Sequence, residues 1–207
     1  MKFIKIAFIV EGDGEIAALP VLVRRIVQKI DETVFVGDKT NPIKVARNAL
    51  VKPGVLEWYV GIAAESIGRD GGILILLDSD DDCPAKLAPQ LLKVARETRP
   101  DLPIALIMAH REYESWFLAS AESLRGKHGL SDTFEAPANI EEKRGAKEWL
   151  KKYMPPGSSY KETIHQPLFT REIDIGLARQ NSPSFDKLYR DLQVMILQLQ
   201  EMQSQPN

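Results

Sequence analysis

Two short clusters of acidic residues are the part of this sequence in which residue types and spacing could do chemistry. The first cluster, EGDGE, occupies positions 11–15, and the second, DSDDD, occupies positions 78–82. Hard divalent cations such as Mg²⁺ and Mn²⁺ take oxygen ligands of this kind. Carboxylates that are crowded together also repel one another and raise each other's pKa values unless a cation compensates. The two clusters therefore predict a site for Mg²⁺ or Mn²⁺.

Spacing within the clusters selects four candidate metal ligands. Glu11 and Glu15 are four positions apart, so both can turn toward one point if a helix begins near residue 12 or 13. Asp78 and Asp80 occupy alternate positions, and alternate positions of an extended segment face the same side. Glu11 is also the candidate general base. The four side chains can converge only if the two clusters meet at one edge of the fold.

The remaining residues of the clusters have a functional and a structural interpretation. Gly12 and Gly14 permit unusual backbone angles and the close approach of a phosphate, so they are candidate substrate-binding positions. Asp82 is a candidate additional ligand. Acids after strands are also often solvated, and Asp13 or Asp82 could simply cap the helix that follows. Both interpretations stay open at this point.

Spacing excludes two other binding motifs. The run DSDDDCPAKLAP lacks the glycine at its sixth position and the glutamate at its twelfth that an EF-hand loop needs. The run GDGEIA lacks the third glycine of a dinucleotide fingerprint and the lysine of a phosphate-binding loop. The acidic clusters therefore belong to neither of these motifs.

Apolar segments precede both clusters and must position them. The predicted strands cover residues 2–10, 33–36, 72–77 and 104–109, and the predicted helices cover 16–30, with Pro20 in a first turn, 55–67 and 84–97. Continuous aliphatic runs that alternate with helices predict an α/β fold with a mainly parallel sheet. Ligands bind beyond the carboxyl ends of such strands. If strands 2–10 and 72–77 are neighbours, both acidic clusters lie at one edge.

The character of the chain changes after about residue 120. Glycine, proline and charged residues dominate positions 125–160, with helical fragments predicted at 141–153 and about 168–179. Apolar residues from Phe185 to Leu199 recur at helical spacing and predict a C-terminal amphipathic helix. The tail after it is expected to fray. We therefore expect an α/β core over residues 1–120 and a mostly helical extension over 121–207 that packs on this core.

Composition and charge limit the class of protein. The chain has 207 residues, 44% of them hydrophobic, which suffices for a real core. Its formal net charge of -2 provides no basic footprint for nucleic acid, although a carboxylate site itself lowers the total. The single cysteine, Cys83, excludes an internal disulfide. With no signal peptide pattern and no apolar stretch of about 20 residues, we expect a cytoplasmic protein without a membrane partner.

The sequence also resembles a known superfamily. The segments FIVEGDGEIAALPVLVRRI, ILILLDSDDDCP and HREYESWFLA are similar to those of the Toprim nucleases, primases and topoisomerases. Over nearly the whole chain the sequence resembles, more narrowly, the Toprim-like family DUF4276. The resemblance implies a Toprim-like sheet flanked by helices with a helical C-terminal extension. It also implies that Glu11, Asp78 and Asp80 together hold Mg²⁺.

Related nucleases of the OLD type suggest further roles. Their first motif is ExxxE, which implies that Glu15 helps to hold a second ion, so one or two ions are expected. They also use a downstream acid and a lysine, for which Glu112 or Glu114, and Lys147, are the candidates here. Glu112 and Glu114 follow a predicted strand and could complete the acidic cluster, unless a helix separates them.

A basic rim could accompany this site. Arg111, together with Arg144, Lys151 and Lys152, could bind a phosphate backbone, and Arg111 is the candidate substrate-binding residue among them. The alternative is that these side chains only keep the surface soluble. His110 ends a strand near the predicted site, where a structural hydrogen bond is the simpler interpretation.

Two functions from different classes follow from these observations. The first is phosphodiester hydrolysis that depends on Mg²⁺ or Mn²⁺, with nucleic acid, and DNA by analogy with the superfamily, as the substrate. The second is a non-catalytic regulatory or binding module that works with a separate ATPase. Retention of Glu11, Glu15, Asp78 and Asp80 favours the enzyme, because a degenerate site tends to lose at least one acid.

Overall fold

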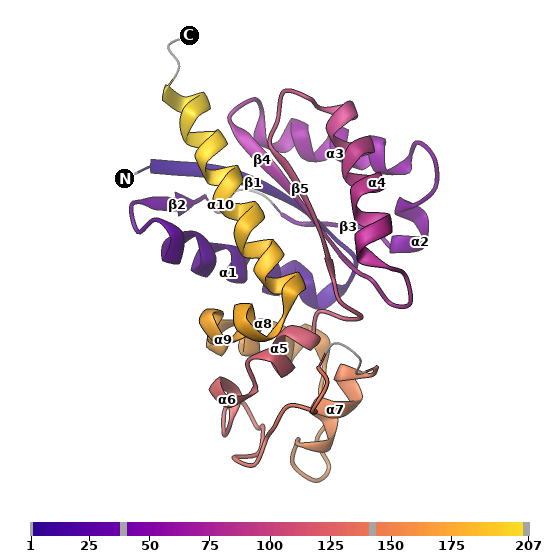
Figure 1. Cartoon of the computed structure of the whole chain (residues 1–207), viewed down its shortest axis with the longest axis vertical. Helices are drawn as coiled ribbons and strands as arrows, with labels where there is room; N and C mark the ends of the chain where they lie inside the picture. Colours follow the sequence, from indigo (N-terminus) through magenta and orange to yellow (C-terminus); the bar gives the residue numbers. More distant parts are fainter. Residues whose placement is uncertain (1, 38–40, 141–143, 205–207) are drawn as a thin grey trace.

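A parallel β-sheet forms the centre of the molecule. In the computed structural model, which describes residues 2–37, 41–140 and 144–204, the sheet has five strands (Figure 1). Their order is β2-β1-β4-β5, and β3 pairs with β1 as well. The strands are β1 (Lys2–Val10), β2 (Val34–Val36), β3 (Ile43–Lys44), β4 (Gly71–Asp78) and β5 (Ile104–Ala109). Every pair is parallel, which confirms the predicted fold class.

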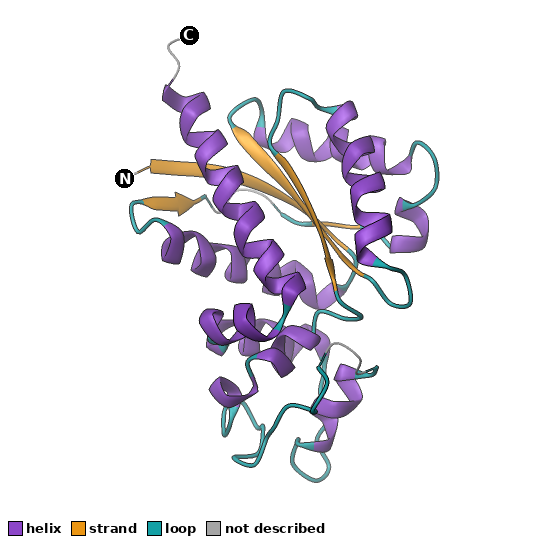
Figure 2. Ribbon diagram, in the orientation of Figure 1, coloured by secondary structure: helices purple, strands orange, loops and turns teal. Residues whose placement is uncertain are grey.

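Helices cover both faces of this sheet (Figure 2). The helices α1 (Asp13–Ile30) and α10 (Pro183–Ser204) pack on one face, and α3 (Val55–Ile67) and α4 (Pro84–Thr98) pack on the other. Strand β4 is buried from Gly71 to Leu77. Burial on both faces explains why its sequence is continuously aliphatic rather than alternating.

Strands β1 and β4 are neighbours in the sheet, as the predicted acidic site requires. Strand β1 pairs with β4 from Lys5 opposite Gly71 to Ile9 opposite Ile75, and β4 pairs with β5 as far as Asp78 opposite Ala109. Because these strands run parallel, their carboxyl ends lie at one edge of the sheet. The loops that follow β1, β4 and β5 therefore meet there. The sequence did not indicate β3 or the short helix α2 (Arg47–Leu50), which lie beside the same edge.

Helix α1 begins earlier than its apolar spacing predicts. It starts at Asp13 rather than Ile16, with Gly12 as the N-cap, so Pro20 lies inside the helix and its predicted place in a first turn is wrong. The early start has a local cause, since the Glu15 carboxylate accepts a hydrogen bond from the backbone N–H of Gly12 at 2.9 Å. This contact satisfies a donor that a helix N-terminus would otherwise leave unpaired.

The C-terminal half adds small helices below the sheet (Figure 1). They are α5 (Ser115–Ala119), α6 (Ala121–Leu124), α7 (Ala146–Lys152), α8 (Glu162–Glu172) and α9 (Ile175–Asn181). The fragment predicted at 141–153 corresponds to α7, and residues 141–143 lie outside the described part. The fragment predicted at 168–179 is wrong as a single helix, because α9 has its own N-cap, Asp174, whose side chain accepts from the Leu177 N–H at 2.9 Å.

The apolar face of the C-terminal helix α10 packs inside the molecule. Its buried side chains, from Phe185 to Leu199, join the core cluster that also contains α1, β1 and β4. The same cluster includes residues on both sides of position 120. The helix continues through Ser204, so the first four residues of the tail that was expected to fray, 201–204, are helical, and residues 205–207 lie outside the described part. None of the helices within the described ranges is long and apolar enough to cross a membrane.

Helices α1 and α8 pack closely near the acidic edge, and Gly14 makes this possible. A Cβ atom at Gly14 would lie 2.1 Å from Gln166 Oε1 and 2.9 Å from the backbone oxygen of Glu162. The Arg25 guanidinium fixes the other end of the contact by donating to the Thr170 and Ile173 carbonyls at 2.6 and 2.8 Å. Gly14 therefore contacts a helix, which differs from its predicted role in binding substrate.

We expect Gly14→Ala to destabilise the protein by about 1–3 kcal/mol, because the added methyl group overpacks the α1–α8 contact. Urea denaturation measures the change. Gly61→Ala is the matched control, since Gly61 is also helical and a Cβ there meets no atom within 4 Å. The control should gain about 0.5–1 kcal/mol from helix propensity. A Gly14→Ala protein as stable as the control would contradict this account of the packing.

Candidate functional site

The carboxyl ends of three strands are tied together by the side chains of Glu11 and Asp78. Glu11 directly follows β1, and its Oε2 accepts a long hydrogen bond from the Asp78 N–H at 3.4 Å. Asp78 ends β4, and its Oδ1 accepts from the Tyr113 N–H, in the loop after β5, at 2.8 Å. The two predicted acids therefore lie where the sheet topology requires them to lie.

Glu15 is buried at the start of α1, with 4% of its surface exposed. Its Oε2 accepts hydrogen bonds from the backbone N–H groups of Glu11 at 3.0 Å and Gly12 at 2.9 Å. A Cβ at Gly12 would lie 3.1 Å from Glu15 Oε1. Gly12 has extended backbone angles, with φ of -104°, so it provides space for this carboxylate rather than an unusual conformation.

Glu114 completes the group from the loop after β5. It is fully buried, and its Oε1 accepts hydrogen bonds from Tyr160 Oη at 2.9 Å and Gln166 Nε2 at 3.0 Å. Its Oε2 is buried and has no hydrogen-bond partner within the described part of the chain. Burial raises the pKa of Glu114 to about 7. An unsatisfied carboxylate oxygen in this position is costly unless another group binds it.

The buried carboxylates act on one another electrostatically. Burial raises the pKa of Asp78 well above its usual range, and the negative charges of Glu15 and Glu114 raise it further. Burial also raises the pKa of Glu15 and of Glu11. Glu11 comes from the loop after β1, Glu15 from the start of α1, Asp78 from the end of β4 and Glu114 from the loop after β5. The sheet edge therefore concentrates negative charge in a poorly hydrated place.

Lys147 is a nearby cation that offsets this charge. Its positive charge lowers the pKa values of Asp78, Glu15 and Glu114. Burial acts against the charged form of Lys147, but Glu114 and Glu162 outweigh burial, and its pKa is raised. Its Nζ pairs with Glu162 Oε1 at 2.7 Å. The structure thus places Lys147, on α7, beside the predicted acids.

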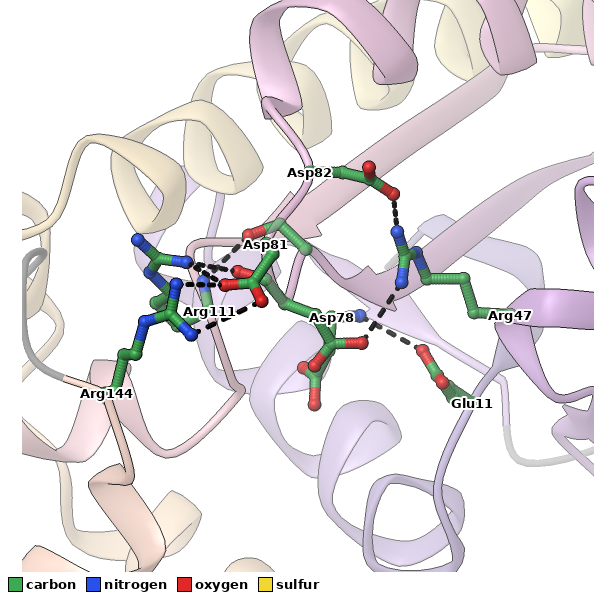
Figure 3. A network of polar contacts seen from close by, with 9 residues as sticks. Glu11, Arg47, Asp78, Asp81, Asp82, Arg111 and Arg144 are labelled. Atoms are coloured by element: carbon green, nitrogen blue, oxygen red, sulfur yellow. Dashed lines mark hydrogen bonds and ion pairs between the residues drawn. The ribbon is translucent and has the colours of Figure 1, made fainter.

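Asp80 and Asp82 lie apart from this buried group. Asp80 has a left-handed backbone with φ of 46°, so the extended alternation that would place it on the same side as Asp78 ends before it. Its Oδ2 pairs with Arg47 Nη1 at 3.0 Å, and Asp82 pairs with the same guanidinium (Figure 3). The negative charge of Asp80 still raises the pKa of Glu11. Neither Asp13 nor Asp82 is an N-cap, a position held by Gly12 and Cys83.

Glu112 and Glu114 face different surroundings. Glu114 has helical backbone angles at the N-cap of α5, so the two side chains separate. Glu112 lines a cavity of about 170 Å³ with Asp80, Asp81, Arg111 and Arg144. Its Oε2 accepts a long hydrogen bond from the Lys147 N–H at 3.4 Å.

Three residues that shape this site were not predicted from the sequence. Tyr113 donates its N–H to Asp78, Gln166 donates to Glu114, and Arg47 pairs with Asp80. Arg47 follows a strand of two residues, which is too short to produce a pattern. Tyr113 and Gln166 act through a backbone group and a buried amide, and neither carries a motif.

The carboxylate group fits a divalent cation in charge and in donor type. The group supplies carboxylate oxygens, Glu114 Oε2 is buried without a partner in the described chain, and burial raises the pKa values of its members. Within the described ranges, no three His, Cys, Asp or Glu side chains stand in a ready-made ligand arrangement. Binding would therefore require side-chain adjustment, chiefly at Asp80 and Arg47.

Fold and site together define a parallel α/β protein with a carboxylate cluster at the carboxyl ends of its strands. The chain belongs to the family described as "Domain of unknown function (DUF4276)", which matches residues 10–193. No curated protein matches the chain. Among solved structures, the C-terminal region of the Burkholderia pseudomallei OLD protein aligns over 94% of this chain and 98% of its own, with 17% identity and a TM-score of 0.40. At this TM-score the likeness assigns neither an activity nor a ligand.

The raised pKa of Glu114 predicts a pH dependence of stability in EDTA. A folded-state pKa of about 7, against an ordinary value of 4.5, means that the folded protein retains a proton that the unfolded chain releases. The free energy of unfolding should therefore fall as pH rises from about 4.5 to about 7. Glu114→Gln should flatten this profile and stabilise the protein at pH 8 by about 3 kcal/mol at most, at about 1.4 kcal/mol per pKa unit.

Urea denaturation between pH 4.5 and pH 8 measures the profile. Glu97→Gln, at an exposed glutamate on α4, is the control and should leave it unchanged. A Glu114→Gln protein with the wild-type slope, or one less stable than wild type at pH 8, would show that Glu114 is not under charge stress.

Proposed function

We propose that this protein is a phosphodiesterase that depends on Mg²⁺ or Mn²⁺ and acts on nucleic acid. The observation that supports the proposal most strongly is the partnerless Oε2 of buried Glu114 beside Asp78, a carboxylate on which Glu11 and Glu15 also act. Proteins rarely bury several carboxylates together unless a cation or a reaction uses them. The Toprim-like pattern of the sequence, with acids after β1 and β4, agrees with this proposal.

Glu11, Asp78 and Glu114 are the proposed primary ligands. Asp80 could join them if it exchanged its ion pair with Arg47. Glu15 keeps one oxygen on two backbone N–H groups, so only its Oε1 remains for a second ion, and one or two ions are compatible with the site. A bound Mg²⁺ or Mn²⁺ would place positive charge against phosphate oxygens and make an attacking water more acidic.

The protein's own residues would orient the substrate and move the proton. Glu11 would serve either as a ligand or, with an oxygen that the ion leaves free, as the base that accepts a proton from water. Lys147 opens onto a cavity of about 440 Å³ that Lys151, Tyr160 and Lys161 also line. Lys147 would hold a phosphate beside the carboxylates, while Lys151 and Lys161 would add only a general attraction, which Glu148 and Glu162 of the same cavity partly offset.

DNA is the proposed substrate by analogy with the superfamily alone, and a separate ATPase is a proposed partner on the same basis. The apolar face of α10, a possible docking surface, is buried against the sheet. That face is therefore not free to dock a partner, although Val194 and Leu197 on the opposite side of α10 are exposed.

The central test is metal binding with matched variants. Isothermal titration calorimetry with Mn²⁺ and Mg²⁺ should show binding by wild type, and Asp78→Asn and Glu11→Gln should each weaken it at least tenfold, because each removes a charged ligand. Asp13→Asn is the control, since Asp13 belongs to the same EGDGE motif but pairs with Lys44 at 2.7 Å. It should bind metal as wild type does.

Plasmid cleavage by the same samples separates the enzyme from a binding module. Cleavage by wild type and Asp13→Asn, lost in Asp78→Asn, is the expected result. Metal binding without cleavage of DNA or RNA would support the regulatory module. Absence of binding at millimolar Mn²⁺ would overturn the proposal.

Lys147→Gln tests the role of the lysine separately. We expect it to slow cleavage by about 10²-fold or more, because it removes a charge aimed at the phosphate, while Mn²⁺ still binds. Lys151→Gln, one turn further along α7, should change the rate by less than about fivefold. Equal effects of the two substitutions in single-turnover cleavage would indicate general attraction of DNA rather than a positioned lysine.

A further inference from the structure

Three arginines, here called the arginine arms (Arg47, Arg111 and Arg144), pair with the exposed part of the second acidic cluster, the aspartate loop at residues 80–82. Figure 3 shows the three arms around Asp81 and Asp82. Arg47 Nη1 donates to Asp80 Oδ2 at 3.0 Å, and its Nη2 pairs with Asp82. The side chain of Arg47 is 17% exposed, whereas that of Asp80 is 61% exposed. Arg47 Nε is buried and has no hydrogen-bond partner among the described residues. Burial of the Arg47 side chain and its ion pairs with Asp80 and Asp82 therefore hold this guanidinium in place.

The other two arms share Asp81. Arg111 Nη1 lies 2.7 Å from Asp81 Oδ1 and also donates to the Asp80 carbonyl at 2.8 Å. Arg144 Nη2 lies 2.6 Å from the same Asp81 Oδ1. Arg111 and Arg144 line the cavity of about 170 Å³ between the loops after β4 and β5. Three positive and three negative side chains thus neutralise one another beside the buried carboxylates.

Hydrogen bonds between two residues with strained backbones hold this arrangement in place. Asp80 and Arg111 are both in the left-handed region, with φ of 46° and 64°, which is unfavourable for residues other than glycine. The Asp80 N–H donates to the Arg111 carbonyl at 3.1 Å, and the Arg111 N–H donates to Ser79 Oγ at 2.8 Å. The two strained residues hold each other, so the arms and the loop are positioned as one unit.

We propose that the arginine arms bind the phosphodiester backbone of a nucleic acid and that the aspartate loop holds them until a divalent cation binds. This inference rests on the proposed function and adds a coupling between its two ligands. A guanidinium matches a phosphate through two parallel hydrogen bonds as well as it matches a carboxylate. The aspartate partners in these ion pairs are well exposed to solvent, and solvent weakens such pairs, so an exchange of partners costs little.

The cation and Arg47 compete for Asp80. When the cation takes Asp80, the Nη1 of Arg47 is released next to it, at the place where a phosphate would approach, while Nη2 can keep its pair with Asp82. Cation binding and phosphate binding should therefore strengthen each other, by the same factor in both directions. Removing Arg47 should have opposite effects on the two ligands, which a merely structural role would not produce.

Arg47→Gln tests this coupling. Calorimetry with Mn²⁺ gives the metal affinity, and fluorescence anisotropy with a labelled single-stranded DNA and its RNA counterpart gives the nucleic-acid affinity, at saturating Mn²⁺ and in EDTA. Because the proposed activity would cleave natural strands, both oligonucleotides carry phosphorothioate linkages, which keep the charge and resist hydrolysis, and gel electrophoresis verifies that they stay intact. The same DNA with uncharged methylphosphonate linkages removes the phosphate charge. Arg190→Gln is the control, at an exposed ion pair on α10.

We expect Arg47→Gln to bind Mn²⁺ about three- to tenfold more tightly and oligonucleotide at saturating Mn²⁺ about five- to tenfold more weakly than wild type, up to about 1.4 kcal/mol each. The control should match wild type, and the methylphosphonate DNA should not distinguish the variants. Equal or same-direction changes for the two ligands, with Mn²⁺ binding intact in wild type, would overturn the exchange alone. No Mn²⁺ binding by wild type would overturn both the exchange and the proposed function.

Asp81→Asn provides a second test that leaves the arms intact. It removes the carboxylate that holds Arg111 and Arg144, so oligonucleotide binding in EDTA should strengthen about threefold or more. Circular dichroism verifies that the variant is folded. A folded Asp81→Asn protein with unchanged or weaker oligonucleotide binding in EDTA would contradict the proposal.

Discussion

Negative charge crowded at one edge of a parallel sheet is the constraint on which the rest of this structure depends. Asp78 and Glu114 are packed where burial and neighbouring carboxylates raise their pKa values. Charged groups in such a place destabilise a fold unless they are compensated. The surrounding elements either supply groups that compensate this negative charge or hold the carboxylates together in spite of their repulsion.

Two kinds of compensation are present. Lys147 supplies a positive charge to the buried group from α7, and the arginine arms neutralise the exposed aspartate loop. Backbone N–H groups hold the carboxylates of Glu15 and Asp78 in fixed positions. The aliphatic core beneath β4, together with the close α1–α8 contact at Gly14, provides the rigidity that keeps these groups from separating. One oxygen of Glu114 is left unsatisfied even so.

The sequence was sufficient for every strand of the sheet except the two-residue β3, and for part of the site. Continuous aliphatic runs identified β1, β4 and β5, and parallel topology then placed Glu11 and Asp78 at one edge. The alternation rule failed at Asp80, because a left-handed backbone angle cannot be read from an aspartate-rich run. Arg47 was missed because a two-residue strand has no period. The separation of Glu112 from Glu114 depends on where α5 begins, and element boundaries are the least predictable feature of a sequence.

The most direct test of the central claim is the anomalous scattering of Mn²⁺ in crystals of the protein soaked with MnCl₂. If the protein binds metal as proposed, we expect a peak among the carboxylates of Asp78, Glu11 and Glu114. Glu114 Oε2 should turn toward this peak, and Arg47 should move away from Asp80. A peak only on the outer aspartates, or no peak at millimolar Mn²⁺, would show that the buried carboxylates are compensated by the protein alone, and the metal-dependent function would be wrong.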